Sequence, residues 1–452
     1  MSLEPLLSLK HRALRAGAWI FGGHISGQAL RLASNLVMTR LLVPEMFGVM
    51  AIASMVLAGI SLLSDLGTNM SVVQSARGED PDFLNTVWVV QIIRGVIMCL
   101  IALLVSLGFY CAAHFGWIPQ NTAYAQPVLP LVLACVSLTA LISGFESTRL
   151  ATASRRLAQG LLTLVEIVSQ VAGIVVMMLW AMVDRSIWAL VAGGLAVSIV
   201  KTVSSHLMLP GEPNRWVWDK SAVDEILHFG KWIFISSILG FLLNNGDRLL
   251  LGGMISANVL GIYVIALFIK NSMAEIVGKI LASVAFPVLS ETVRTNPEKL
   301  AAIYYKFRLP FDIVLLFLSG LFFVAGRYVI YFLYDARYVQ AGMMLQMLSL
   351  TLVAFRYNVV DQCYLALGKP KFLVAIIVIR TVALFGLLPL AFKEYQMLGA
   401  LWVIVISAFS SIPLTLYLKR KLNLLDVRKE LLVLPAFIIG AGVGFVFEKI
   451  IG

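Results

Sequence analysis

Long apolar runs separated by short polar segments follow one another along the whole chain. About 20 apolar residues in a helix span the hydrocarbon core of a bilayer, where open sheets leave backbone groups unsatisfied. The pattern predicts membrane-spanning helices at residues 16–38, 47–66, 86–112, 127–145, 160–183, 187–209, 231–254, 261–284, 310–324, 342–367, 372–392 and 398–418. A last apolar run at 431–447 is predicted either to span the membrane or to lean on the outside.

The first and second halves of this pattern resemble each other. Gly48 aligns with Gly261 and Leu41 with Met254, and at a slightly longer offset Glu146 aligns with Asp361. Weak internal similarity of this kind is typical of transporters built from repeated halves. The sequence therefore predicts an all-α polytopic membrane protein with two six-helix lobes in a parallel internal repeat, plus an extra C-terminal helix. We expect lobes at 1–209 and 230–420, a cytoplasmic linker at 210–229, and a basic segment with the extra helix at 421–452.

Composition strengthens the membrane assignment. Hydrophobic residues make up 60% of the 452 residues and charged residues 13%, against about 25% charged in soluble proteins. The mean hydropathy is +0.92. The first apolar run is polar-studded and lacks a small-residue cleavage site, so we expect no cleaved signal peptide. The four cysteines are scattered and show no disulfide or metal pattern.

The loop cations predict an orientation. With the N-terminus in the cytoplasm, the outer loops hold few basic residues and the inner loops hold many, including Arg77, Arg308 and Lys419. Cytoplasmic loops of membrane proteins carry an excess of Lys and Arg. We therefore expect a multi-pass protein of a bacterial cytoplasmic (inner) membrane with a cytoplasmic N-terminus.

Polar residues recur at helical spacing inside three of the apolar runs, and we expect them to line a wet cavity. A charged group facing lipid costs about 2.5–3.5 kcal/mol or more, so several charges on one helix face are expected to meet protein or water. These polar residues are Gln28, Arg31 and Asn35 in the first run, Asn244, Asp247 and Arg248 in the seventh, and Lys270, Glu275 and Lys279 in the eighth.

Structural interpretations compete with this one. Glu275 with Lys279, and Asp247 with Arg248, could be ion pairs that join helices. Glu166 and Arg380 could each line the cavity or bridge two helices. Arg94 and Lys201 lie near the ends of their runs, and we expect them to extend to the membrane interface. The glycines at 193–194 and 440–444 are expected to permit close helix packing.

Several function classes are disfavoured by the sequence. We find no P-loop, GxSxG, HExxH or CxxC motif, and the histidines are dispersed. We therefore expect no enzyme activity, no cofactor, no metal site and no nucleic-acid partner.

Five stretches resemble the polysaccharide transport family of the multidrug/oligosaccharidyl-lipid/polysaccharide flippase superfamily. They are RLLVPEMFGVMAIA at 40–53, LLSDLGTNMSVVQ at 62–74, NNGDRLLLGGMISANVLGIYVIA at 244–266, FPVLS at 286–290 and LALGKPK at 365–371. The resemblance implies two lobes around a central cavity that opens alternately to either side of the cytoplasmic membrane. It also implies that an undecaprenyl-diphosphate-linked oligosaccharide moves outward for O-antigen or exopolysaccharide synthesis, with other polysaccharide-assembly membrane proteins as possible partners.

A basic cavity suits that cargo, because fixed cations compensate a diphosphate and arginine binds phosphate oxygens in pairs. We expect Arg31, Arg248, Lys270 and Lys279 to hold the diphosphate, and Gln28, Asn35 and Asn244 to lie in the same cavity. Asp247, Glu275 and Glu166 are candidates for coupling to a proton or sodium gradient. The alternatives are a peptidoglycan lipid-precursor flippase, a multidrug cation antiporter of the same superfamily and, more remotely, a membrane glycan polymerase or ligase.

Overall fold

The computed structural model describes residues 4–64, 68–156 and 158–451, and every regular element in them is helical. The first helices are α1 (Glu4–Leu41), α2 (Pro44–Leu63), α3 (Thr68–Gln74), α4 (Pro81–His114), α5 (Leu129–Gly144), α6 (Arg149–Arg155), α7 (Gln159–Val183) and α8 (Trp188–Leu207). Then follow α9 (Lys220–Gly252), α10 (Ala257–Thr295), α11 (Leu300–Leu333), α12 (Gln340–Ser349), α13 (Thr351–Phe355), α14 (Asn358–Ala366), α15 (Lys371–Ser410), α16 (Ile412–Lys421), α17 (Val427–Leu432) and α18 (Pro435–Ile451). Short 3-10 turns lie at Ala123–Ala125, Pro297–Lys299 and Ala336–Tyr338.

The predicted apolar runs lie in helices, and most of them fall within described stretches that could span a membrane. Nine helical stretches among the described residues are long and apolar enough to cross a membrane, and a tenth is added if the pair α5 and α6, bent by 62°, forms one span. The stretches are Pro44–Leu62, Pro81–His114, Gln159–Val183, Trp188–Leu207, Ala257–Ile276, Pro297–Leu333, Gln340–Ala366, Lys371–Lys421 and Val427–Ile450. The all-α polytopic membrane class is confirmed, while the arrangement as two repeated six-helix lobes stays a prediction.

One of these stretches contains two predicted helices. Lys371–Lys421 has 51 residues, far more than one crossing of a bilayer needs. Gln396 breaks α15 with a φ of 51° and a ψ of −140°, in a region that residues other than glycine rarely adopt. The chain therefore turns at Gln396, between the runs predicted at 372–392 and 398–418.

The chain divides into two compact units. The first contains Met1–Phe241 and Gly252–Asn258, and the second contains Leu242–Leu251 and Val259–Gly452. The non-helical residues 210–219 pack on α4 in the first unit, where Asp219 N donates to Thr86 Oγ1 at 3.1 Å and Arg215 N donates to Asn85 Oδ1 at 2.9 Å. The linker predicted at 210–229 stays a prediction.

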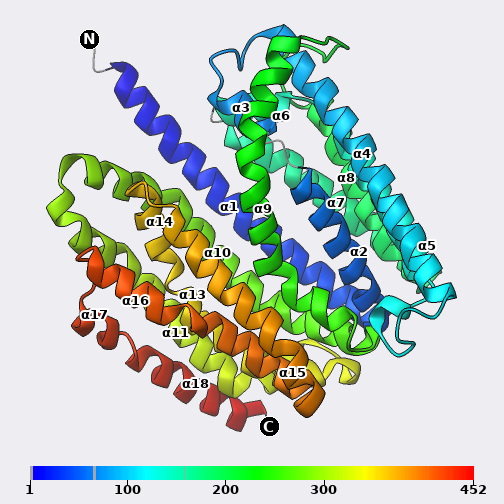
Figure 1. Ribbon diagram of the computed structural model, residues 1–452, viewed down its shortest axis with the longest axis vertical. Coiled ribbons are helices and arrows are strands. Elements are labelled where there is room, and N and C mark those ends of the chain that lie inside the picture. The colour runs from blue at the N-terminus through cyan, green and yellow to red at the C-terminus, as the bar shows by residue number, and fades with distance from the viewer. Residues whose placement is uncertain (1–3, 65–67, 157, 452) are drawn as a thin grey trace. The chain divides into compact units, whose positions relative to one another are not determined.

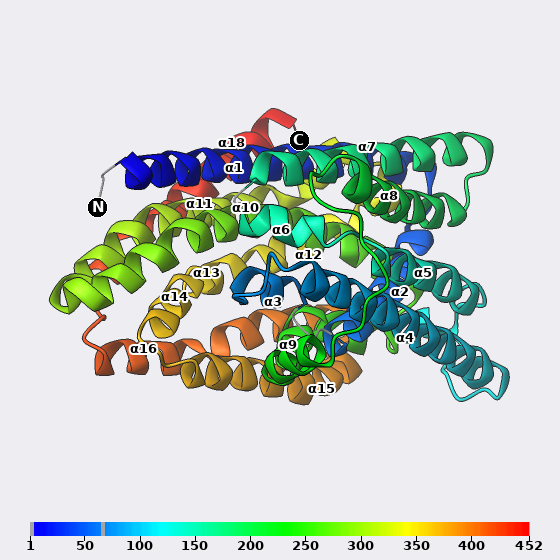
Figure 2. The same ribbon diagram turned by 90° about the horizontal axis from the view of Figure 1, so that it is seen from above.

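Close helix pairs in each unit depend on glycines. In the first unit α7 packs along α8 (Figure 2), and a Cβ on Gly173 would come within 2.9 Å of the carbonyl oxygen of Gly193. In the second unit α18 runs along α11 (Figure 1), and a Cβ on Gly440 would come within 2.0 Å of the carbonyl oxygen of Phe317. These contacts agree with the close packing expected at 193–194 and 440–444.

The second unit also contains a group of buried charges, which we name the closed charge cluster. Its members are Arg308 and Asp312 on α11, Arg356 after α13, Lys419 on α16 and Glu430 on α17, and each is at most 7% exposed. Both oxygens of Glu430 accept hydrogen bonds from the guanidinium of Arg308, and one of them also accepts a bond from the Lys419 ammonium. Asp312 Oδ2 lies 3.1 Å from Arg308 Nε.

This cluster corrects one expectation. Arg308 and Lys419 are not loop cations at the membrane surface, because both are fully buried and ion-paired. Their helices extend past the apolar runs on which the prediction was based, so both residues lie within helices. Their main carboxylate partner, Glu430, lies on a separate helix, α17.

Candidate functional site

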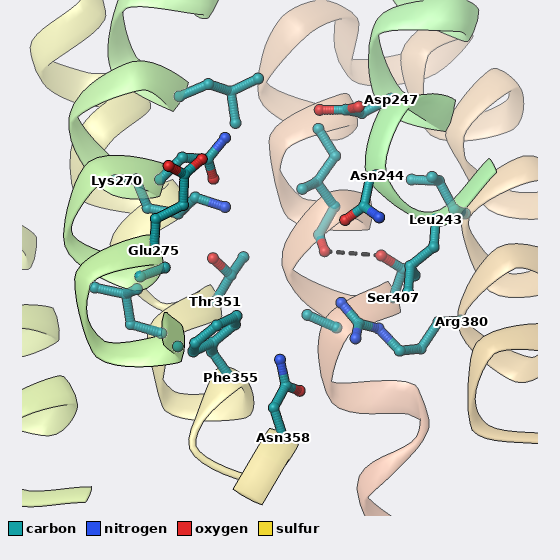
Figure 3. A pocket seen from close by; sticks show the side chains of 18 of the residues that line it. Leu243, Asn244, Asp247, Lys270, Glu275, Thr351, Phe355, Asn358, Arg380 and Ser407 are labelled. Atoms are coloured by element: carbon teal, nitrogen blue, oxygen red, sulfur yellow. Dashed lines mark hydrogen bonds between the residues drawn. The ribbon is translucent and has the colours of Figure 1, made fainter. Parts of the chain in front are cut away.

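The second unit contains a cavity of about 580 Å³ whose lining includes both charged and apolar side chains. Five elements contribute to it, namely α9, α10, α13, α14 and α15, and Figure 3 shows their side chains converging on one space. The charged residues that line it are Asp247, Arg248, Lys270, Glu275 and Arg380, and the neutral polar ones are Asn244, Asn271, Thr351, Asn358 and Ser407. We name this space the second-unit cavity.

Helical spacing explains how α9 and α10 supply this lining. Asn244, Asp247 and Arg248 follow each other at intervals of three and one, which places them on one face of α9. On α10, Asn271 and Glu275 are four positions apart and share a face, and Lys270 beside Asn271 lines the cavity too (Figure 3). Only a few residues join the two helices, and Tyr263 OH on α10 donates to Asp247 Oδ2 on α9 at 2.5 Å.

The cations of the cavity are held in different ways. Arg248 Nη2 donates to the carbonyl oxygen of Asn244 at 2.9 Å, while its Nε lies 4.0 Å from Asp247 Oδ1. Within the described part of the chain, Lys270 makes no hydrogen bond or salt bridge. The buried Nε atoms of Arg248 and Arg380 find no hydrogen-bond partner among the described residues either.

These donors indicate an anion-binding space. A buried donor without a partner is costly, so such groups usually meet water or a ligand. Three cations and two carboxylates line the cavity, which leaves the lining net positive if all five are ionised. The arrangement can hold a phosphate or a carboxylate, because guanidinium groups bind both in a bidentate manner.

The structure brings together half of the predicted site residues. Asn244, Asp247, Arg248, Lys270 and Glu275 all line the second-unit cavity. Lys279 lies on the same helix, α10, but its side chain lies outside the described residues. Arg380, which the sequence left between a cavity role and a bridging role, lines the cavity too. Sequence reasoning did not find Asn358 and Ser407, because isolated neutral polar residues in apolar runs are too common to stand out.

The other predicted residues lie in the first unit. Arg31 on α1 has its Nη2 4.0 Å from Glu166 Oε1 on α7, and both side chains are about half exposed, at 51% and 56%. Glu166 therefore bridges helices rather than standing apart from other charges. Gln28 is buried on α1 and Asn35 is half-buried. A cavity shared by these residues and those of α9 and α10 stays a prediction.

Arg94 and Lys201, which we expected to extend to the membrane interface, both have polar partners within the first unit. Arg94 Nη2 donates to the carbonyl oxygen of Ser61 at 2.9 Å, and Lys201 Nζ lies 3.1 Å from Glu146 Oε1. Both residues line a separate cavity inside the first unit. Position near the end of a run does not reveal that polar groups of neighbouring elements are within reach.

Two curated relatives match about two thirds of the chain. The lipopolysaccharide biosynthesis protein WzxC of Escherichia coli K12 is 23% identical over 310 residues, which are 66% of this chain and 58% of that protein. A membrane protein of the cps region of Klebsiella pneumoniae is 20% identical over 304 residues, 66% of this chain and 60% of that protein. The matches thus span less than two thirds of the length of these relatives.

Solved structures share the fold over nearly the whole chain. The lipid II flippase MurJ in an inward closed conformation superposes with a TM-score of 0.65 at 12% identity, covering 95% of this chain and 98% of MurJ. An inward-facing multidrug resistance transporter of the MATE family, from the MOP superfamily, has a TM-score of 0.63 at 14% identity, covering 93% and 96%. At such identities the likeness shows the fold alone.

The family assignment depends on a longer match. The family of polysaccharide biosynthesis proteins matches residues 37–343, which is more than half of the chain and includes α9, α10 and the turn between them. This confirms the resemblance found in the residues. The chain therefore belongs to the family of polysaccharide biosynthesis proteins and is a multi-pass membrane protein with the fold of MOP-superfamily transporters.

Proposed function

We propose that this protein is a flippase that moves undecaprenyl-diphosphate-linked oligosaccharide units from the inner to the outer leaflet of a bacterial cytoplasmic membrane. The observation that carries the proposal is the second-unit cavity, where Arg248, Lys270 and Arg380 converge inside a bundle of apolar helices. Membership of the polysaccharide biosynthesis family supports the cargo class. Alternating access of this cavity carries the headgroup while the prenyl tail stays in lipid.

The physical reason is the charge of the cargo. A diphosphate that leaves water loses its hydration, and fixed cations in a low-dielectric cavity replace it. Arg248 and Arg380 have buried Nε atoms without a partner among the described residues, and they bind phosphate oxygens at these donors. Lys270 adds a point charge on the opposite helix (Figure 3). Lys279, Arg31, Gln28 and Asn35 complete the path in this proposal.

Three alternatives differ in the cavity that they require. A multidrug cation antiporter needs an acidic lining, and the second-unit cavity has three cations against two carboxylates. A peptidoglycan lipid-precursor flippase also moves a lipid-linked diphosphate, so growth after deletion separates it from the proposed role. A membrane glycan polymerase or ligase needs a reacting group beside the glycan, and the transporter fold of MurJ and the MATE protein favours transport.

The test measures lipid-linked intermediates in cells. In a strain with an intact polysaccharide locus, deletion of this gene should leave viable cells that accumulate lipid-linked repeat units on the inner leaflet. Arg248→Gln and Lys270→Gln should reproduce the defect at normal protein levels. Arg337→Gln is the matched control, because Arg337 lies at the surface of the same unit in an ion pair with Asp335. Normal surface polysaccharide in both cavity variants contradicts the proposal, and so does lethality of the deletion.

Ion coupling is the second part of the proposal. Asp247 and Glu275 line the cavity beside the cations, and Glu166 lies 4.0 Å from Arg31, so a change in their charge alters the net charge that the cargo meets. Binding of a proton or a sodium ion at these carboxylates then drives the cycle. Transport in inverted vesicles should fall when either gradient is collapsed and should lose that dependence in Asp247→Asn. Transport that ignores both gradients contradicts the coupling.

The proposal also includes an orientation and partners. We place the N-terminus in the cytoplasm and expect contacts with other polysaccharide-assembly membrane proteins. A reporter fused before α1 should be active only in a cytoplasm-sensing form, and the opposite pattern contradicts the orientation.

A further inference from the structure

A second polar cavity, of about 680 Å³, lies wholly inside the first unit and plays no part in the mechanism above. Residues of α2, α4, α5 and α8 line it, and we name it the first-unit cavity. Its charged residues are Arg94, Glu146 and Lys201, and many of its other polar residues carry hydroxyl groups, such as Ser61, Ser143 and Ser198. Its volume lies within the range of about 300–1,000 Å³ that is usual for small-ligand sites.

The charged groups of this cavity are fixed in position. Arg94 Nε donates to Ser64 Oγ at 3.2 Å, and its Nη2 donates to the carbonyl oxygen of Ser61 at 2.9 Å. Lys201 Nζ lies 3.1 Å from Glu146 Oε1, so a carboxylate of the chain itself already binds this ammonium. Each cation is therefore bound to a group of the protein itself, and both line the same cavity.

The closed charge cluster of the second unit offers a comparison. There, Arg308 on α11 and Lys419 on α16 both donate to one carboxylate, that of Glu430. In the predicted repeat, α4 and α11 contain the third helices of the two halves, and the sixth helices end with α8 and α16. An arginine and a lysine thus recur on corresponding helices, but in the first unit they face a cavity.

We propose that the first-unit cavity binds a sugar that carries a carboxylate, such as a uronic acid residue of the glycan. The sugar carboxylate displaces Glu146 from Lys201 and is held by Lys201 and Arg94. Hydroxyl groups of the ring exchange hydrogen bonds with the serine hydroxyls of the lining. This inference rests on the proposed function, because it takes the glycan of the flipped lipid as the source of the sugar.

The lining favours this ligand class over two others. A neutral sugar accepts hydrogen bonds from the two cations but carries no charge to pair with them, whereas a carboxylate also gains the attraction between opposite charges. Inorganic phosphate accepts hydrogen bonds from the cations and from serine hydroxyls, but it is smaller than a sugar and reaches fewer of the hydroxyls spread over the lining, such as those of Ser143 and Ser198. The density of hydroxyl groups therefore selects a polyol, and the net positive lining selects an acidic one.

The experiment measures protection of a reporter cysteine. In the full chain, with the four native cysteines replaced by alanine, Ser198→Cys places a thiol on the cavity wall. The rate of maleimide alkylation is followed in membranes against increasing glucuronate, glucose or inorganic phosphate, and each protection curve gives an apparent Kd. Glucuronate should protect at the lowest concentration of the three probes.

Three variants separate binding from a structural role. Arg94→Gln and Lys201→Gln should each raise the apparent Kd for glucuronate about tenfold, because each removes a charge-assisted hydrogen bond. Glu146→Gln should lower it several-fold, because it removes the internal competitor. A purely structural role for Glu146 predicts no such gain. Arg94→Lys should bind glucuronate more tightly than Arg94→Gln does. Arg156→Gln is the control, because Arg156 forms an exposed ion pair with Glu79, and it should leave the apparent Kd unchanged.

Two results overturn the inference. One is that glucuronate does not slow alkylation. The other is that its protection is not specific, because phosphate or glucose protects equally well or because glucuronate still protects both Arg94→Gln and Lys201→Gln. Either result leaves the expected phenotypes of the deletion and of the second-unit cavity variants unchanged. Failure of this inference is therefore distinguishable from failure of the flippase proposal.

Discussion

Two groups of cations in the second unit differ in what surrounds them. In the closed charge cluster Arg308 and Lys419 are fully buried and share the carboxylate of Glu430. In the second-unit cavity Lys270 and Arg380 face an open space, and the Nε of Arg380 has no partner among the described residues. The two groups differ in whether a carboxylate of the protein pairs directly with the cations. The first group holds helices together, and the second is available to a ligand.

The largest expected effect comes from removing the counter-charge of the closed charge cluster. Glu430→Gln leaves buried cations without their main partner, and breaking a buried ion pair in this way costs about 3–5 kcal/mol. The melting temperature of the purified protein in detergent should fall strongly. Glu448→Gln is the control in the same C-terminal segment, because Glu448 accepts one hydrogen bond among the described residues, from Tyr328, and the substitution should cost about 1 kcal/mol. Equal melting of both variants contradicts the structural role of the cluster.

The next effect tests the hydrogen bond that positions a carboxylate of the cavity. Tyr263 is fully buried and donates to Asp247 Oδ2, so Tyr263→Phe should cost about 1.5–3 kcal/mol, the usual range for a hydrogen bond to a charged group. Tyr364 is equally buried, but its hydroxyl has no partner among the described residues, so Tyr364→Phe should be neutral or stabilising. Thermal melting of both variants measures the difference, and a larger loss for Tyr364→Phe contradicts it.

A smaller effect on stability, with a clear effect on transport, is expected for Lys270→Met. Lys270 has no salt bridge among the described residues, so its removal should change the free energy of unfolding by less than about 1 kcal/mol. Removing one contact to a diphosphate should lower transport about tenfold or more. Surface polysaccharide and melting temperature are measured together, with the exposed Lys393→Met as control. Full transport in Lys270→Met would remove the functional distinction between the cavity cations and those of the closed charge cluster.

The smallest effect is expected at a surface ion pair of the first unit. The guanidinium of Arg77, 2.7 Å from Asp219 Oδ2, lowers the pKa of that carboxyl below its usual value. Because the folded pKa lies below the unfolded one, the pair stabilises the protein above the unfolded pKa, and this stabilisation is lost as pH falls through the folded pKa. The melting difference between wild type and Asp219→Asn should shrink on acidification from neutral pH. A difference that grows instead contradicts the assignment.

The sequence predicts the fold well because the bilayer imposes a strong length requirement on apolar runs. It also brought Asp247, Arg248 and Lys270 together correctly, since helical spacing determines which residues share a face. It could not distinguish the two groups of cations described above. Arg308 lies at the edge of an apolar run just as a loop cation does, and its partner Glu430 is 122 positions away in the sequence. No local pattern reveals that pairing.

The same limit applies to the first unit. Arg94 and Lys201 were expected at the membrane interface because each is close to the end of its run. Their actual partners, Ser61 and Glu146, lie on neighbouring elements that only the folded chain brings close. Arg31 was expected to hold the diphosphate, and the sequence did not reveal that Glu166 on α7 lies 4.0 Å from it.

The distance along the chain between Arg308 and Glu430 has a consequence for biosynthesis. A ribosome adds about 5–20 residues per second, so roughly 6–24 s pass between the synthesis of this arginine and that of the glutamate 122 residues later. During that interval α11 is inserted with its guanidinium lacking the Glu430 counter-ion. Maturation of the second unit therefore waits until α17 has been synthesised, and a premature stop before Glu430 should send the nascent protein to membrane proteolysis.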